Sequence, residues 1–121
     1  MSKTVLIVDD SESIREAVSF ALEEAGHNVF KAINGVDALT YLDGREINAM
    51  ITDLHMPLMN GIQLIRKVRT MEAYAKIPIL FLTTESQQEM KLEAKAAGAT
   101  GWVIKPFVPE KILAALAKLV R

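Results

Sequence analysis

Hydrophobic residues along this chain fall into two alternating kinds of segment. Short apolar runs rich in β-branched residues alternate with longer stretches in which apolar residues recur every three or four positions. The first pattern is typical of strands and the second of amphipathic helices. Four runs are interpreted as strands buried on both faces: Val5–Val8, Ala49–Ile51, Ile79–Leu82 and Trp102–Ile104. A fifth run, Asn28–Ala32, alternates and carries Lys31, so we place it at an edge of the sheet.

The clearest predicted helix begins at a capping box formed by Ser13 and Glu16 and ends at Gly26. Four further helices are predicted at Val36–Leu42, Ile62–Met71, Gln87–Ala97 and Pro109–Val120. The fourth helix is weakly amphipathic, so we expect it to pack marginally. Strands and helices that alternate at this spacing require right-handed crossovers, which place helices on both faces of a parallel sheet. The sequence therefore predicts an α/β fold, a single doubly wound (βα)₅ domain over residues 1–121.

Amino-acid composition limits where in the cell the protein is expected to act and which class of partner it is expected to bind. Half of the 121 residues are hydrophobic, which suffices for one core, and no linker or effector domain is expected. The chain has no cysteine, no long apolar run and no leader, so we expect a cytoplasmic protein without membrane insertion. A net charge of −1 lacks the basic excess that direct nucleic-acid binding needs. Arg66, Lys67 and Arg69 on the third helix are interpreted as a solvated face.

Polar residues stand directly after the predicted strands. Asp9 and Asp10 follow the first strand, Asp53 follows the third, Thr83 ends the fourth and Lys105 follows the last. In parallel sheets the carboxyl ends of the strands meet at the ligand crevice, so three carboxylates and one ammonium are expected to converge there. Clustered carboxylates repel unless a cation intervenes, and oxygen ligands favour Mg²⁺ or Mn²⁺. The layout predicts phosphoryl transfer, with Asp53 as nucleophile, the metal and Lys105 offsetting charge, and Thr83 donating a hydrogen bond.

The whole chain resembles the receiver domain of two-component response regulators, in particular the stand-alone chemotaxis (CheY-like) type. The motifs that carry the resemblance are Val8-Asp9-Asp10, Thr52-Asp53-Leu54-His55-Met56-Pro57, Asn60-Gly61, Thr83 and Lys105-Pro106-Phe107. The resemblance implies a flavodoxin-like sheet in the strand order 2-1-3-4-5. It also implies that a histidine kinase is the phosphodonor, that Mg²⁺ is the cofactor with Mn²⁺ able to substitute, and that the Lys105-Pro106 bond is cis.

Further roles follow from the same resemblance. Asp10, Asp53 and the main-chain carbonyl of His55 are implied to bind the metal, while Asp9 acts largely through water. Lys105 is implied to reach the phosphoryl group. The His55 side chain flanks the pocket, where we expect it either to tune turnover or simply to face solvent.

A second set of residues is expected to transmit the signal or flank the site. Thr83 and Trp102 occupy the hydroxyl and aromatic positions that the family couples as a switch. Thr84 stands where many members have Ala or Gly, so we expect it to narrow access to the pocket. Glu85 and Pro106 are expected to flank the pocket, Glu85 with the same two interpretations as His55. Output to a downstream protein is implied to use the face of the fourth helix, fifth strand and fifth helix.

Two other function classes fit the same architecture. A flavodoxin-like carrier should present small residues after the first strand, whereas Asp9, Asp10 and Glu12 would repel a phosphate there. An aspartyl phosphatase needs a general acid near Asp53, and neither a suitable neighbour nor a cap domain is evident. We therefore expect no enzyme beyond catalysis of its own phosphorylation and dephosphorylation. The remaining alternative is a degenerate receiver that binds a partner independently of phosphorylation.

Overall fold

Five parallel strands form a single sheet in a computed structural model, which describes residues 3–119. The strands are β1 (Thr4–Val8), β2 (Asn28–Ala32), β3 (Ala49–Thr52), β4 (Ile79–Thr83) and β5 (Gly101–Ile104). Their order, β2-β1-β3-β4-β5, confirms the predicted topology and the edge position of Asn28–Ala32. The prediction that Trp102–Ile104 is buried on both faces is wrong. β5 forms the other edge, with a neighbouring strand on one side only, and its residues are partly exposed.

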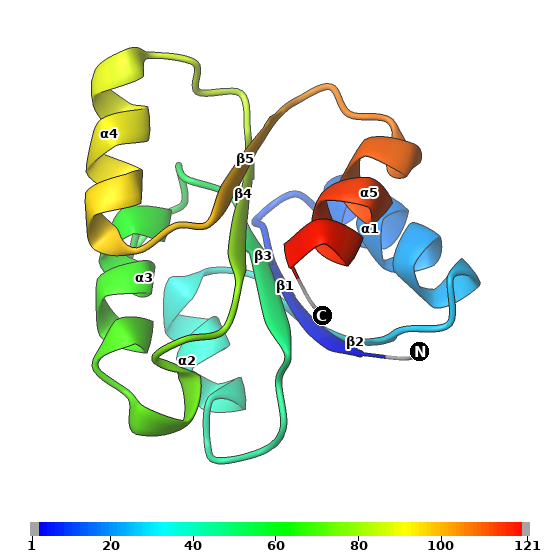
Figure 1. Ribbon diagram of the computed structural model, residues 1–121, viewed down its shortest axis with the longest axis horizontal. Helices are drawn as coiled ribbons and strands as arrows, with labels where there is room; N and C mark the ends of the chain where they lie inside the picture. Colours follow the sequence, from blue (N-terminus) through cyan, green and yellow to red (C-terminus); the bar gives the residue numbers. More distant parts are fainter. Residues whose placement is uncertain (1–2, 120–121) are drawn as a thin grey trace.

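Helices cover both faces of this sheet. The five helices are α1 (Glu12–Glu24), α2 (Gly35–Tyr41), α3 (Gly61–Arg69), α4 (Gln88–Ala97) and α5 (Pro109–Leu119). α1 and α5 lie on one face, and α2, α3 and α4 lie on the other (Figure 1). All five confirm predicted helices, although the predicted end at Val120 lies outside the described residues. The short 3₁₀ helix η1 (Glu72–Tyr74) was not predicted.

The N-terminus of α1 differs from the prediction. The capping residue is Ser11, whose hydroxyl accepts a hydrogen bond from the Ile14 amide at 3.4 Å, and Ser13 lies inside the first turn. The Asp9 carboxylate accepts the Ser11 amide, which turns the chain into the helix two residues earlier than expected. At the other end, Gly26 follows the helix with a φ of +93°, which confirms the predicted stop.

Two hydrophobic clusters hold the layers together. Along β1 the side chains alternate, so Leu6 and Val8 pack under α2, α3 and α4, while Val5 and Ile7 pack under α1 and α5. α4 contributes least to this core, because Ala94 is its only buried residue among those described. Its predicted marginal packing is confirmed. None of the helices in residues 3–119 is long and apolar enough to cross a membrane.

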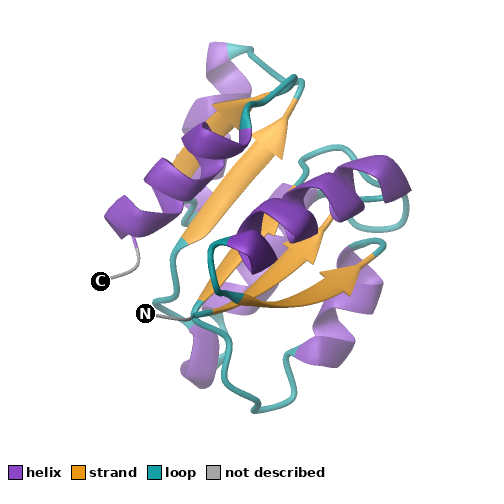
Figure 2. Cartoon of the chain, turned by 90° about the vertical axis from the view of Figure 1, so that its right-hand side faces the viewer, coloured by secondary structure: helices purple, strands orange, loops and turns teal. Residues whose placement is uncertain are grey.

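Strand register brings the functional residues to one edge. Figure 2 shows the strand arrows pointing the same way, so their carboxyl ends meet along one side of the sheet. Val8 pairs with Thr52, and Thr83 pairs with Ile104. The residues that follow β1 and β3 are therefore neighbours, and so are those that follow β4 and β5.

Candidate functional site

Three carboxylates converge at this edge, as predicted. Asp9, Asp10 and Asp53 each offer one oxygen, and the three oxygens lie within 4.8 Å of one another. Asp9 and Asp53 are buried, with exposed fractions of 2% and 8%, whereas Asp10 is exposed. Within residues 3–119, Asp10 forms no ion pair. The cluster can therefore receive a ligand from the side of Asp10.

Lys105 supplies the positive charge of the site. Its Nζ lies 2.9 Å from Asp9 Oδ2 and 3.3 Å from Asp53 Oδ2. Burial alone would lower the pKa of Lys105, but its two carboxylate partners outweigh burial and raise it. Burial raises the pKa of Asp9, and the hydrogen bond from Lys105 opposes this rise only in part. One ammonium against three carboxylates leaves two negative charges uncompensated, which suits a divalent cation with oxygen ligands.

The position of Asp53 is fixed by the loop that follows β3. Its Oδ1 accepts the Leu54 amide at 2.7 Å, and the Gly61 amide donates to the Leu54 carbonyl at 2.8 Å. A Cβ atom on Gly61 would overlap the Asp53 carbonyl oxygen and the Phe81 ring. Only glycine therefore allows the start of α3 to close so tightly on the residue that carries the candidate nucleophile.

Asp9 is held by two residues that were not predicted to belong to the site. The Ser11 amide donates to Asp9 Oδ1 at 2.9 Å, and Arg15 Nη1 donates to the Asp9 carbonyl at 2.7 Å. The Asp-x-Ser spacing is a known turn signal and could have identified Ser11. No local pattern points to Arg15, because its partner is fixed by the fold.

Glu85 links the two predicted switch residues. Thr83 is fully buried, and its Oγ1 accepts the Glu85 amide at 3.2 Å. The Trp102 indole donates to the Glu85 carbonyl at 3.1 Å, and the centre of its ring lies 5.2 Å from the centre of the Phe81 ring. Thr83 and Trp102 are thus connected through one peptide segment of the β4–α4 loop, a link the sequence did not reveal.

The residues expected to flank the pocket differ in solvent exposure and in their contacts. His55 Nε2 and Glu85 Oε1 lie 2.8 Å apart, and this hydrogen bond lowers the pKa of Glu85. Plain solvent exposure is therefore wrong for the Glu85 side chain, which is only 14% exposed, while that of His55 is 61% exposed. Thr84 and Pro106 are exposed. The Lys105-Pro106 bond is cis, as the resemblance implied.

Comparison with known proteins places these features in a family. Residues 5–117 match the response regulator receiver domain. The chain is 38% identical to a chemotaxis protein CheY homolog of Campylobacter jejuni, over 88% of this chain and 83% of that protein. It is 37% identical to chemotaxis protein CheY1 of Helicobacter pylori, over 88% and 87%. The solved structure of Vibrio cholerae CheY4 superposes with a TM-score of 0.95 and 43% identity, over 99% of this chain and 100% of that one.

Proposed function

Because the chain belongs to the response regulator receiver domain family, we propose that it accepts a phosphoryl group on Asp53 and passes this event to a protein partner. The observation that carries the proposal is the buried Asp53 carboxylate, which lies beside Lys105 and within a cluster of three carboxylates. The family relationship and the similarity to chemotaxis proteins support a role as a single-domain response regulator in chemotaxis.

The donor set suits Mg²⁺, and Mn²⁺ could take its place. Asp10, Asp53 and the main-chain carbonyl of His55 would hold the ion, with Asp9 acting through water. When bound, the ion offsets negative charge on the phosphoryl oxygens. Oxygen ligands and the two uncompensated charges of the cluster support this assignment.

Asp53 would act as the nucleophile towards a phosphohistidine of a histidine kinase. One of its oxygens forms the new bond to phosphorus while the bond from phosphorus to the histidine nitrogen breaks, and that nitrogen keeps the electron pair. The Leu54 amide orients the carboxylate, the Lys105 ammonium contacts a phosphoryl oxygen, and the Thr83 hydroxyl donates to another. Attack by water on phosphorus breaks its bond to the Asp53 oxygen, which keeps the electron pair, and releases inorganic phosphate. In this proposal the protein catalyses only its own phosphorylation and dephosphorylation.

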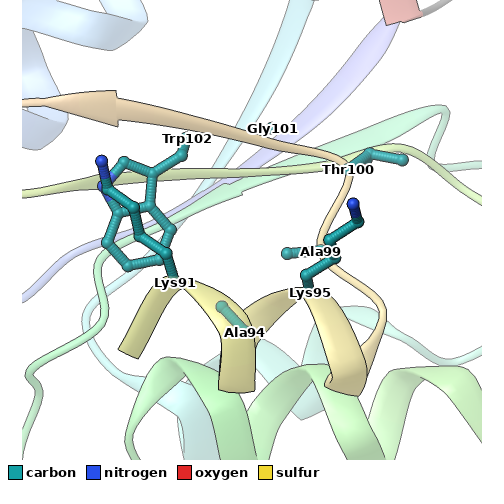
Figure 3. Close-up of a pocket in the computed structure, with 7 residues that line it drawn as sticks. All are labelled: Lys91, Ala94, Lys95, Ala99, Thr100, Gly101 and Trp102. Atoms are coloured by element: carbon teal, nitrogen blue, oxygen red, sulfur yellow. The ribbon is translucent and has the colours of Figure 1, made fainter. Parts of the chain in front are cut away.

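Output would use the face built by α4, β5 and α5. A groove of about 300 Å³ lies between α4 and β5, and Lys91, Lys95 and Trp102 are among the residues that line it (Figure 3). Two ammonium groups beside an indole suit a partner segment that brings carboxylates and an apolar side chain. Lys111 adds a further exposed charge on α5. A protein target, rather than nucleic acid, in the cytoplasm fits this surface and the net charge of −1.

Trp102 would report the change of state. If Thr83 turns towards a phosphoryl group, the Glu85 segment that it holds moves, and the indole loses or changes its hydrogen bond to the Glu85 carbonyl. We predict that the emission of Trp102, the only tryptophan, changes when beryllofluoride, a phosphoryl mimic, is added with Mg²⁺. Unchanged emission and unchanged access to a quencher would remove Trp102 from the switch.

Intact mass after incubation with acetyl phosphate tests the proposal. We expect one phosphoryl adduct that requires Mg²⁺ and is lost in Asp53→Asn. Asp43→Asn serves as the matched control, because Asp43 is exposed and paired with Arg45 away from the site; it should form the adduct as the parent does. A folded parent without adduct would favour the degenerate receiver, which the complete set of acceptor, lysine and hydroxyl positions otherwise disfavours.

A further inference from the structure

The C-terminal end of α4 is firmly attached to the rest of the domain. The amides of Gly98 and Ala99 both donate to the carbonyl of Ala94, the buried residue of the helix, at 3.1 and 3.0 Å. The Gly98 carbonyl in turn accepts Arg69 Nη2 at 2.6 Å. Arg69 ends α3, so one guanidinium joins the ends of two helices.

Both terminal nitrogens of Arg69 take part in this attachment. Its Nη1 donates to the carbonyls of Tyr74, Ala75 and Ile77 at 3.3, 3.1 and 2.8 Å. The interpretation of Arg69 as part of a solvated face is therefore wrong. Tyr74 and Gly98 stand at the ends of η1 and α4, where a cation is favourable.

Gly98 is shaped to receive the arginine. Its φ is +117°, and a Cβ atom there would approach Arg69 Nε to 2.7 Å. The next residues are fixed as well, because Thr100 exchanges hydrogen bonds with Ile79 at the start of β4 through both its amide and its hydroxyl. Residues 98–100 are thus tied to α3 on one side and to the sheet on the other.

Within residues 3–119, no side chain binds main-chain carbonyls at the N-terminal end of α4 as Arg69 does at the other end. The capping residue Gln87 makes no side-chain hydrogen bond to the helix, and Leu92 is 57% exposed. Met90 packs partly buried against the core, and the polar contacts of this end lead to the switch residues. The Gln87 amide donates to the Glu85 carboxylate, and Lys91 Nζ lies 5.8 Å from the centre of the Trp102 ring. A change at Trp102 therefore reaches the N-terminal half of α4 first.

We propose that Arg69 is a positioning residue that acts as the pivot of α4. It holds the C-terminal end of the helix still, so that phosphorylation displaces only the N-terminal half and reshapes the groove at its Lys91–Trp102 end. The other end of the groove is formed by Lys95, Ala99 and Thr100 (Figure 3). Under this proposal, that end keeps its shape when the protein is phosphorylated. The displacement of the N-terminal half of α4 rests on the proposed phosphoacceptor function. The attachment of its C-terminal end by Arg69 does not.

Amide hydrogen exchange in the unphosphorylated protein tests the attachment. Arg69→Met keeps the aliphatic stem and removes every donor, so exchange at Gly98 and Ala99 should rise about tenfold while residues 86–92 change little. Arg69→Lys, which keeps the charge with fewer donors, should give a smaller rise at the same amides and serves if Arg69→Met does not fold. Arg66→Met is the matched control, because Arg66 also lies on α3 and contacts α4 through Glu93, but is exposed. Equal exchange in all variants, or a rise along the whole of α4, would overturn the pivot.

Beryllofluoride with Mg²⁺ tests the displacement. In the parent, exchange should change in residues 86–92 and not at Gly98 and Ala99, whereas in Arg69→Met the change should spread to both ends. Equal changes at the two ends of α4 in the parent would contradict the proposal. If beryllofluoride fails to bind the parent, the phosphoacceptor function fails. Amide exchange in the unphosphorylated variants still decides whether Arg69 holds the C-terminal end of α4.

Discussion

Replacing Lys105 by methionine removes the ammonium group that contacts the carboxylates of Asp9 and Asp53. The substitution keeps the length of the side chain and leaves Asp9 and Asp53 buried without their ammonium partner. At neutral pH and without divalent ions, we expect the variant to be markedly less stable than the parent, because buried carboxylates would then face one another uncompensated.

The distances set the size of the effect. At an effective dielectric constant of about 20, the ammonium attracts Asp9 at 2.9 Å by about 6 kcal/mol and Asp53 at 3.3 Å by about 5 kcal/mol. Desolvation of the ammonium cancels much of this gain, and removing one partner of a buried pair typically costs about 3–5 kcal/mol. We expect a loss of about 3 kcal/mol in the free energy of unfolding, at the low end because Asp9 can take up a proton.

The loss should depend on pH in a defined direction. Burial already raises the pKa of Asp9, and removing the opposing hydrogen bond from Lys105 raises it further. A carboxyl group with a raised folded-state pKa stabilises the fold below its unfolded value of 3.8, and this contribution is lost as pH rises through the folded-state pKa. The deficit of Lys105→Met should therefore shrink as pH falls from about 7 to about 4.

Urea denaturation in EDTA, followed by circular dichroism, measures both effects. Lys111→Met is the matched control, because Lys111 is exposed on α5 and should change stability by less than about 0.5 kcal/mol. A Lys105→Met variant as stable as this control at neutral pH would refute the electrostatic account of the site. So would a deficit that grows as the pH is lowered.

Three further predictions concern the same edge of the sheet. Asp10→Asn should raise the free energy of unfolding in EDTA by about 1–2 kcal/mol, because it removes a negative charge within 4.8 Å of two other carboxylates. The same variant should gain less stability from Mg²⁺, and a less stable variant in EDTA would contradict this prediction. Gly61→Ala should lower the free energy of unfolding, measured by urea denaturation, by about 2–3 kcal/mol, because the added methyl group overlaps Asp53 and Phe81. Unchanged stability would show that the loop can relax. Thr84→Ala should shorten the lifetime of the phosphoryl group, whereas equal lifetimes would refute a role for Thr84 in limiting access.

The sheet was predictable because its central strands are buried on both faces. Continuous apolar runs follow from that burial, and Lys31 identified β2 as an edge. The same reasoning failed for β5, whose apolar run resembles a central strand although it lies at the other edge. Two nearby serines compete to cap α1, and only the contact of Ser11 with Asp9 decides between them. A three-residue helix such as η1 has no periodicity to detect.

The functional residues were predictable as far as they end strands. Parallel topology alone carries Asp9, Asp53 and Lys105 to one place, whatever the loops do. The contacts of Glu85 and Arg69 were not predictable, because they depend on how loops and helix ends meet in three dimensions. Arg69 in particular has the sequence context of a surface residue, and only the fold shows that its partners are four main-chain carbonyls.

Borohydride reduction tests the central claim most directly, because it reports the modified atom. The protein is treated with acetyl phosphate and Mg²⁺, reduced, digested and sequenced by mass spectrometry. An aspartyl phosphate at position 53 is converted to homoserine, and we expect this product at Asp53 alone and only with Mg²⁺ present. Homoserine at Asp9 or Asp10 instead, or an unmodified Asp53 in folded protein, would contradict the assignment of Asp53 as the phosphoacceptor.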